Sequence, residues 1–308
     1  MDVLTAVDAD RIAADQRDRH SFWLDLVRPA DEEIDRLGEL LELHPVAVED
    51  TREFGQRPKV DVYQDHVLLV FFTARLDDEG AVTPIEVHVY VAGNFLITVR
   101  RDKCAILDDL RDRVEEIHEH PVYEILDTLT DAFYPVIEGL EERIDALEAE
   151  VLTRPRRDQL SQIYRLLQEV RGIGRIASVQ RDQFAASSDD VREMLALTDT
   201  GEYLRDIGDH LAQIAGELHA QTEDLSSLTS TYFNANADRL NAIATRLTIV
   251  GTLFVVWTLV TGFFGQNFEW LTDHVQSRTS FAILGLGGLI IPTVILLTVF
   301  WLKRRDWF

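Results

Sequence analysis

The sequence predicts an α+β membrane protein, with an N-terminal α/β domain, a long helical stalk and two C-terminal transmembrane helices. Strand and helix patterns alternate over residues 20–100, whereas only helical periodicity follows from about Ala105. Two long apolar runs without charges occupy the last quarter of the chain. We therefore expect an α/β domain (1–104), a helical domain (105–200), a stalk helix (201–246), a first span (247–268), an outer loop (269–279), a second span (280–302) and a basic tail (303–308).

The first domain is predicted to contain a mixed sheet. Apolar, β-rich runs stand at residues 21–27 ("SFWLDLV"), 66–75 ("HVLLVFFTAR"), 85–91 ("IEVHVYV") and 95–100 ("FLITVR"). The turn-forming "DDEG" separates the second run from the third, and "AGN" separates the last two. Between the first two runs, "ADEEIDRLGELLEL" at 30–43 is typical of an amphipathic helix, because acids fill its first turn.

Three long helical stretches are predicted after residue 105. Apolar residues recur at helical spacing up to the break at Arg154-Pro155: Ile137, Leu140, Ile144, Leu147 and Val151. A return helix carries Leu160, Ile163, Leu167 and Val170, and "SSDD" at 187–190 is interpreted as the turn that follows it. A near-heptad stripe comes next: Tyr203, Ile207, Leu211, Ile214, Leu218, Leu225, Leu228 and Tyr232. This stripe could continue into the first span as one helix of about 60 residues, or about 90 Å. We expect neighbouring subunits to cover it.

The two uncharged runs predict a membrane hairpin. Each exceeds the roughly 20 residues that an α-helix needs to cross the hydrocarbon core. The connecting loop holds a single basic residue, Arg278. The basic residues just outside the hairpin are Arg239, Arg246, Lys303, Arg304 and Arg305. By the positive-inside rule, both termini are expected in the cytoplasm and the protein in the cell (plasma or inner) membrane.

Composition limits the possible functions. Acidic residues number 54 against 30 basic ones, a formal charge of −24, so the chain repels nucleic acid and attracts cations. A single cysteine, Cys104, excludes an internal disulfide and a cysteine-based zinc site. "RGIGRI" at 171–176 lacks the strand and the third glycine of a dinucleotide site. His118 and His120 extend to no metal-ligand spacing, and no catalytic signature is present, so we expect no enzyme.

One face of the first span is small or polar, although the other faces are bulky. Its members are Asn241, Ala244, Thr248, Gly251, Val255, Thr258, Gly262 and Gly265. Two interpretations fit this pattern. Small residues allow close helix packing in membranes, whereas side-chain oxygens in an apolar segment are typical of a pore wall.

The end of the first span resembles the Gly-x-Asn signature of the CorA-type (two-TM-GxN) divalent metal ion transporters, because residues 265–268 read "GQNF". The cytoplasmic motifs are also similar to that family and stand in its order: "WLDL" at 23–26, "LHPVAVED" at 43–50, "QRPKV" at 56–60 and "YLRDIGDH" at 203–210. The resemblance implies a homopentameric funnel whose pore is lined by the first span, and uptake of Mg²⁺, with Co²⁺ or Ni²⁺ as further substrates. It therefore favours the pore-wall interpretation.

The resemblance also implies roles for individual residues. Gly265, Gln266 and Asn267 would form the selectivity filter, where Asn267 oxygens accept hydrogen bonds from a hydrated ion. Glu269 and Asp273 would attract cations to the outer mouth. Asn241 and Thr258 would be polar stations. An apolar gate is expected among Ala244, Leu247, Gly251 and Val255.

A regulatory metal site is the last implication. Glu49, Asp50 and Asp206 match the family's inhibitory intracellular site, with Asp127, on the first long helix, as a further member. Mg²⁺ is thus expected as substrate and as regulatory ligand, without any other cofactor. Gln266 departs from the family's common Gly-Met-Asn, which leaves a Zn²⁺ transporter as an alternative. A membrane-anchored acidic scaffold or sensor without transport is the alternative of another class.

Overall fold

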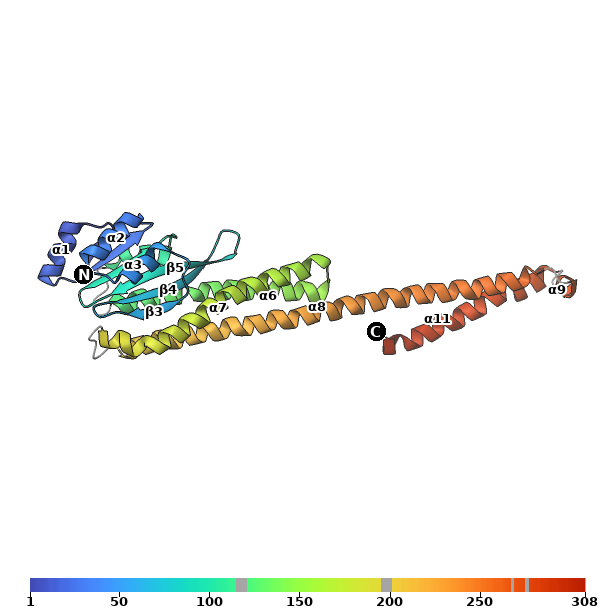
Figure 1. Ribbon diagram of the computed structural model, residues 1–308. Coiled ribbons are helices and arrows are strands. Elements are labelled where there is room, and N and C mark those ends of the chain that lie inside the picture. Colours follow the sequence, from blue (N-terminus) through green and yellow to red (C-terminus); the bar gives the residue numbers. More distant parts are fainter. Residues whose placement is uncertain (115–120, 195–200, 267–268, 275–276, 308) are drawn as a thin grey trace. The chain divides into compact units, whose positions relative to one another are not determined.

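The computed structural model describes residues 1–114, 121–194, 201–266, 269–274 and 277–307 (Figure 1). The chain divides into two compact units, Met1–Tyr232 and Phe233–Phe308. The first unit contains a sheet, the helices that cover it and a helical bundle. The second contains the apolar helices. Helix α8 (Gly201–Phe264) begins in the first unit and ends in the second, so the expectation of one helix of about 60 residues is confirmed.

The sheet of the first unit is mixed, as predicted. Its strand order is β1-β2-β6-β5-β4-β3, in which the β1–β2 and β2–β6 pairs are parallel and the other pairs antiparallel. The strands are β1 (Asp2–Leu4), β2 (Phe22–Val27), β3 (Lys59–Val62), β4 (Val67–Leu76), β5 (Val82–Val91) and β6 (Phe95–Arg100). The four strands expected from apolar runs are present, while the short β1 and β3 at the sheet edges were not foreseen.

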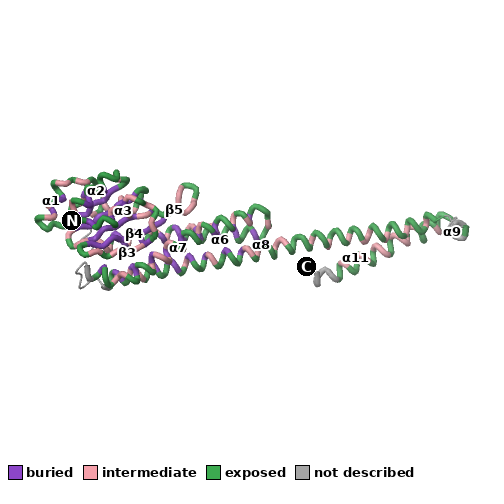
Figure 2. The backbone as a smooth tube through the Cα atoms, viewed as in Figure 1, coloured by how far each residue is buried: buried purple, intermediate pink, exposed green. Residues whose placement is uncertain are grey.

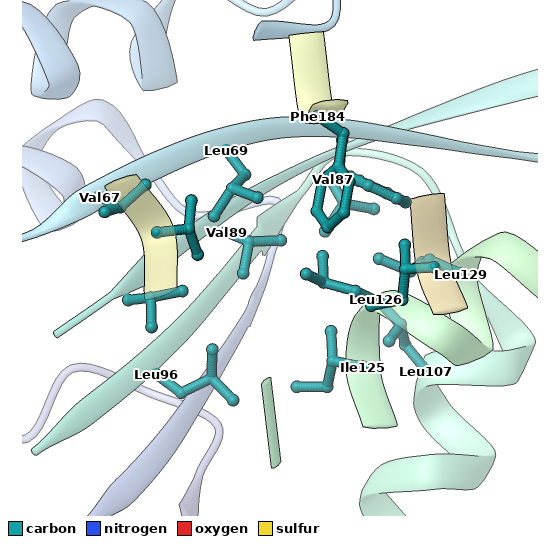
Figure 3. Packing of buried hydrophobic residues seen from close by; sticks show 14 of the residues in the cluster. Val67, Leu69, Val87, Val89, Leu96, Leu107, Ile125, Leu126, Leu129 and Phe184 are labelled. Carbon is teal, nitrogen blue, oxygen red and sulfur yellow. The ribbon is translucent and has the colours of Figure 1, made fainter. Parts of the chain in front are cut away.

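Both faces of the sheet are buried, and alternate residues of β4 serve opposite faces. Leu68, Val70 and Phe72 belong to a core with α1 (Ala9–Asp18), α2 (Asp31–Leu40) and α3 (Pro45–Arg52). Val67, Leu69 and Phe71 belong to a second core with α4 (Ala105–Asp112), α5 (Pro121–Asp131), α7 (Arg157–Met194) and the start of α8 (Figure 3). Burial on both faces explains why β4 reads as an unbroken apolar run.

A three-helix bundle extends the first unit. Helix α6 (Phe133–Thr153) returns through α7, and both pack on α8 through a third core, in which the buried residues form stripes along the helices (Figure 2). The predicted stripe of α8 is buried from Ile207 to Tyr232 within this single chain, so the expectation that neighbouring subunits cover it was wrong. Tyr203 does not belong to the stripe; it is exposed and Leu204 is buried in its place.

The predicted turn at 187–190 was also wrong, because "SSDD" lies inside α7. Phe184 and Val191, on either side of it, are both buried in the core beneath the sheet. They are seven residues apart and share one face of a continuous helix. This apolar spacing therefore outweighs the turn preference of serine and aspartate: Asp189 and Asp190 are exposed, and Ser187 and Ser188 are half-buried beside the core face.

Gln180 of α7 extends the hydrogen bonding of β4. Strand β3 pairs only with Val67–Val70, so the backbone of Phe72 has no strand on that side. The Gln180 side chain takes this place: its Oε1 accepts from the Phe72 N–H at 2.6 Å, and its Nε2 donates to the Phe72 carbonyl at 3.1 Å. One buried carboxamide thus satisfies both backbone groups and ties α7 to the sheet.

A buried ion network connects β2, β6 and α4. The Arg100 guanidinium donates to both carboxylate oxygens of Asp25 and to Asp108, at 2.6 to 3.3 Å. Arg111 donates to Asp25 as well, at 2.9 Å. The Arg100 and Asp25 side chains are fully buried and have no contact with bulk water. Each charge is therefore stabilised by the opposite charge of the other.

The second unit contains α9 (Glu269–His274), α10 (Arg278–Ser280), a π-helical segment η2 (Phe281–Leu286) and α11 (Gly287–Trp307), together with the last part of α8. Two helices are long and apolar enough to cross a membrane, within Glu202–Phe264 and Arg278–Leu302. No residue in the most apolar part of either helix is buried in this chain, unlike the core helices of the first unit. Such side chains require a lipid or protein environment.

The last part of α8 packs against α11. The Trp257 indole donates a hydrogen bond to the Thr293 hydroxyl at 2.9 Å. Gly288 packs on Val260 and Phe264, and a Cβ there would make ordinary van der Waals contacts with their side chains, at 3.5 and 3.6 Å. A small residue on one helix and a polar contact between helices are both typical of membrane helix pairs.

Candidate ion pathway and candidate metal site

The predicted pore-lining residues share one exposed face of α8. Every member is exposed in the chain: Asn241, Ala244, Leu247, Thr248, Gly251, Val255, Thr258 and Gly262. The partly buried residues of the same segment recur at helical spacing on another face: Ala242, Thr245, Ile249, Thr252, Leu253, Val256, Val260 and Phe264. That second face includes the residues that Gly288 approaches. The small and polar face is therefore left uncovered by α11.

The threonine hydroxyls of this face are oriented by their own helix. Thr258 donates to the Phe254 carbonyl at 2.7 Å, and Thr248 donates to the Ala244 carbonyl at 2.9 Å. Each hydroxyl proton is donated to a backbone carbonyl. Toward the outside of the helix, the oxygen therefore presents only lone pairs, which accept hydrogen bonds. An oxygen in this state can accept a hydrogen bond from a hydrated cation. It cannot donate one to an anion without breaking its backbone bond.

Gly265 and Gln266 are the part of the Gly-x-Asn signature that the structure describes, and they lie directly after the end of α8. The Gly265 N–H donates to the Thr261 carbonyl at 2.9 Å, and a Cβ at Gly265 would approach that carbonyl to 3.2 Å. Gln266 is exposed and lies in a groove with Val255, Thr258 and Gly262. Asn267 lies outside the described residues. Glu269 and Asp273 are exposed on α9.

A separate cluster in the first unit can hold a metal ion. One ligand atom from each of Asp127, Asp131 and His210 lies within 4.8 Å of the other two. The His210 Nδ1 stands 3.7 Å from Asp127 and 3.8 Å from Asp131, and its Nε2 is 3.8 Å from Asp206. These separations exceed a hydrogen bond. The cluster therefore brings three carboxylates around one imidazole without direct bonding.

Two atoms of the cluster are buried without a hydrogen-bond partner, namely Oδ1 of Asp127 and Nδ1 of His210. Burial, and then the charge of Asp131, raises the pKa of Asp127 from 3.8 to about 6, while His210 opposes the rise. Buried polar atoms usually have a partner. Carboxylates and an imidazole that face one another without a hydrogen bond between them are a donor set that fits a divalent cation, and the imidazole suits Co²⁺, Ni²⁺ or Zn²⁺ better than Mg²⁺.

The structure corrects the predicted location of Asp127. This residue lies on α5, which ends at Asp131, and α6 begins only at Phe133. The break has a simple cause, because Pro135 lacks an N–H and its ring conflicts with the carbonyl four residues earlier, at Asp131. Asp127 and Asp131 are thus placed on the last turns of a separate short helix, facing α8.

The other predicted metal residues have partners within the chain. Asp50, on α3, forms an ion pair with Lys59 at 2.6 Å, and Lys59 also contacts Asp61. Glu49 is exposed. Asp206 accepts a hydrogen bond from the Tyr123 hydroxyl at 3.0 Å, and burial followed by this bond raises the pKa of Tyr123. The site expected from Glu49, Asp50 and Asp206 was a site between chains, and a single chain leaves that prediction open.

Sequence reasoning missed His210 and Asp131. A signal for each was present, because His210 follows Asp206 by one helical turn within "YLRDIGDH", and Asp131 follows Asp127 by one turn. Each pair shares a helix face. What the sequence could not indicate was that these two faces meet.

Comparison with known proteins gives a consistent result. The family model described as CorA-like Mg²⁺ transporter protein matches residues 18–304. The cobalt/magnesium transport protein CorA of Thermotoga maritima is 24% identical over 283 residues, which cover 89% of this chain and 79% of that protein.

Two solved structures are similar in fold. The complete structure of the CorA magnesium transporter from Methanocaldococcus jannaschii has a TM-score of 0.74 at 21% identity, and the match covers 93% of this chain and 91% of that one. The cytoplasmic domain of ZntB from Vibrio parahaemolyticus has a TM-score of 0.57 at 13% identity, over 70% of this chain and 87% of that one.

Proposed function

The chain belongs to the CorA-like Mg²⁺ transporter protein family, and on this premise we propose that it conducts divalent metal cations, chiefly Mg²⁺, into the cell down their electrochemical gradient. The membrane potential favours this direction by about 2.3 kcal/mol per charge per 100 mV, twice over for a divalent ion. The name of the Thermotoga maritima relative supports Mg²⁺ and Co²⁺ as the substrates.

The observation that carries the proposal is the uncovered face of α8. Its hydroxyl oxygens, with their protons bonded to the backbone, offer only acceptors along a membrane-length helix. Hydrated Mg²⁺ presents water protons outward and loses its water shell reluctantly. Acceptors without fixed charge suit such an ion because they bind its waters and still release it. We assign the narrow outer filter to Gly265, Gln266 and Asn267.

Ion flux into proteoliposomes with an imposed membrane potential tests this assignment. Thr258→Val should lower Mg²⁺ flux several-fold, because it removes the acceptor from the uncovered face. Thr252→Val is the matched control, since Thr252 makes the same backbone bond, to Thr248 at 2.8 Å, but is partly buried. Asn267→Ala should abolish flux with assembly intact. Equal flux through the two threonine variants, together with normal flux through Asn267→Ala, would exclude this helix face as the pathway.

Conduction along one face of one helix requires several copies around an axis. We propose a homopentamer with both termini in the cytoplasm, supported by the family membership and by the basic residues outside the hairpin. Native mass spectrometry in detergent should detect five chains. A stable monomer or dimer would contradict this assembly.

We further propose that cytoplasmic divalent cations inhibit the transporter through its acidic residues. Glu49 and Asp50 of one chain and Asp206 of its neighbour would bind one ion, for which Lys59 must release Asp50. Asp127, Asp131 and His210 would hold a second ion beside it. An ion that binds the closed state more tightly holds it closed. Flux through Asp50→Ala/Asp206→Ala should therefore continue at internal Mg²⁺ concentrations that inhibit the parent; inhibition at an unchanged concentration would exclude this site.

Zn²⁺ transport is the second candidate. Gln266 departs from the family's common signature, and the fold of the first unit is similar to that of a ZntB cytoplasmic domain. The same flux assay decides between the two candidates when Mg²⁺, Co²⁺, Ni²⁺ and Zn²⁺ are compared at equal concentration. Preference for Zn²⁺ would replace the proposed substrate but leave the proposed pathway unchanged.

A further inference from the structure

A buried polar cluster fastens α3 to the sheet. It consists of Thr51 on α3 and of Glu86, His88 and Tyr90 on β5. Thr51 and His88 are fully buried, and Tyr90 is nearly so. Alternation along β5 directs all three of its members to the same face, the face that α3 covers. Helix α3 also carries Glu49 and Asp50, so this cluster positions the helix that bears two proposed regulatory residues.

Four short contacts run through the cluster in sequence. The Tyr90 hydroxyl donates to the Ala47 carbonyl at 2.7 Å, and the Thr51 hydroxyl lies 2.7 Å from the Tyr90 hydroxyl. His88 Nδ1 lies 2.9 Å from the Thr51 hydroxyl, and His88 Nε2 lies 2.7 Å from Glu86 Oε1. The Glu86 carboxylate also accepts from the backbone N–H groups of Gly55, at 2.7 Å, and Gln56, at 3.1 Å.

The direction of each hydrogen bond follows from the first. A carbonyl can only accept, so the single Tyr90 proton points to Ala47. The Tyr90 oxygen must then accept from Thr51, whose own single proton is thereby used. Thr51 can only accept from His88, which places a proton on Nδ1. The remaining contact, between Nε2 and Glu86, needs a fourth proton.

Ionised Glu86 and neutral His88 cannot supply that proton. Tyr90, Thr51 and a neutral imidazole bring one proton each, three for the four contacts. Without a further proton, a nitrogen lone pair would face a carboxylate oxygen at 2.7 Å in a buried place. We therefore infer that the His88–Glu86 pair holds one additional proton when α3 is in place, and that loss of this proton loosens α3 from the sheet.

The groups around the pair agree with a single bound proton. Directly opposite His88 on the neighbouring strands stand Val70 and Val99, which carry no charge. On the α3 side, the Phe54 ring stacks on the imidazole at 4.6 Å. The Arg101 guanidinium lies over the Phe54 ring, 4.7 Å from its centroid.

Beyond Tyr90, the nearest titratable groups are His66, with ring centroids 6.0 Å apart, then Tyr63 and Asp50. Burial lowers the pKa of His66, which favours its neutral form. Glu86 is thus the one carboxylate among the described residues that contacts His88.

Proton loss would cost the cluster one of its four buried contacts. The contacts at risk are those that hold α3 and the turn after it. Thr51 bonds to His88, and the N–H groups of Gly55 and Gln56 donate to Glu86. If the proposed inhibitory site is correct, alkaline conditions would weaken cation inhibition by displacing Glu49 and Asp50; this last step rests on the proposed function.

Hydrogen exchange of the full-length protein in detergent tests the inference, read by mass spectrometry over residues 45–56 from about pH 6 to about pH 9, the range around ordinary histidine titration. After correction for intrinsic exchange rates, protection of this segment should fall about tenfold with rising pH, as for loss of one buried hydrogen bond. Protection over α6 provides the internal reference. Glu86→Gln should abolish the fall, because the carboxamide N–H donates to neutral His88 at every pH. The Gln56 N–H, which donates to Oε1 of Glu86 in the parent, loses its acceptor in this variant, so protection should be lower but independent of pH.

His219→Gln is the matched control, since His219 is exposed and its change should leave the fall intact. Protection of residues 45–56 that stays level with pH in the parent would overturn the inference, even if Glu86→Gln did not fold. A fall that persists in folded Glu86→Gln, or disappears in His219→Gln, would overturn it too. None of these measurements involves transport. Failure of ion flux in liposomes would therefore refute the proposed function alone.

Discussion

Replacing Asp127 with asparagine should stabilise the metal-free protein and weaken its stabilisation by divalent cations. The Asp127 carboxylate is partly buried among Asp131, Asp206 and Glu124, and one of its oxygens has no hydrogen-bond partner. At neutral pH this carboxylate is ionised at a cost that only His210 reduces. Asparagine keeps the shape of the side chain and removes the charge.

The size of the effect follows from the pKa of Asp127. A rise from 3.8 to about 6 corresponds to about 3 kcal/mol at 1.36 kcal/mol per pH unit. The side chain is 23% exposed, and solvent screening reduces the cost to about 1–2 kcal/mol. Since the folded pKa lies above the unfolded one, this group stabilises the fold fully below about pH 3.8, and that contribution is lost as the pH rises through about 6.

Thermal unfolding at pH 7 with a chelator, at fixed protein concentration, measures the prediction. Asp127→Asn should raise the apparent Tm by about 2–6 °C relative to the parent. Asp224→Asn is the control, because Asp224 is an exposed carboxylate on α8, the helix that also carries His210. This change should leave the Tm within about 1 °C of the parent's. Added Co²⁺ or Mg²⁺ should raise the parent's Tm and change the Asp127 variant far less. A lower Tm without metal, or equal stabilisation of both proteins by the cation, would refute the reasoning.

Three further predictions concern contacts that stabilise the fold. Arg100→Met leaves Asp25 buried without its main partner and should reduce the free energy of unfolding by about 3–5 kcal/mol in urea titrations; a loss below 1 kcal/mol would show that water replaces the guanidinium. Gln180→Leu leaves both backbone groups of Phe72 unpaired and should cost about 1–3 kcal/mol by the same assay, and an unchanged midpoint would contradict the role of this carboxamide. Trp257→Phe removes the hydrogen bond between the two apolar helices and should cost about 0.6 kcal/mol in detergent unfolding, so that a loss of several kcal/mol would mean that the indole does more than donate this bond.

Periodicity alone was sufficient to predict much of the fold. The apolar runs at 66–75 and 85–91 are strands because they are β-rich and bounded by turns, and the spacing from Ile137 to Val151 is a helix face. Where two local signals competed, the one tied to burial prevailed. "SSDD" favours a turn, but Phe184 and Val191 must both reach the core beneath the sheet, and a continuous helix achieves this.

The candidate site was harder to predict because its members come from separate helices. The small and polar face of α8 could be recognised, since all its members belong to one helix with a known period. The metal cluster requires α5 to end at Asp131 and to face the turn of α8 that carries His210. No spacing within either segment contains that information. The ion pair between Asp50 and Lys59 depends in the same way on the placement of β3 beside α3.

The carboxamide of Gln180 has a consequence for how copies of this protein meet. An exposed strand edge invites a strand from another molecule, and addition of this kind can continue without limit. Here one sheet edge is the three-residue β1, the other carries the charges of Lys59 and Asp61, and Gln180 bonds the Phe72 backbone just beyond the part of β4 that β3 covers. These features disfavour the addition of a strand from another molecule at either edge of the described sheet. Protection of both sheet edges therefore removes one route to open-ended assembly of the chain.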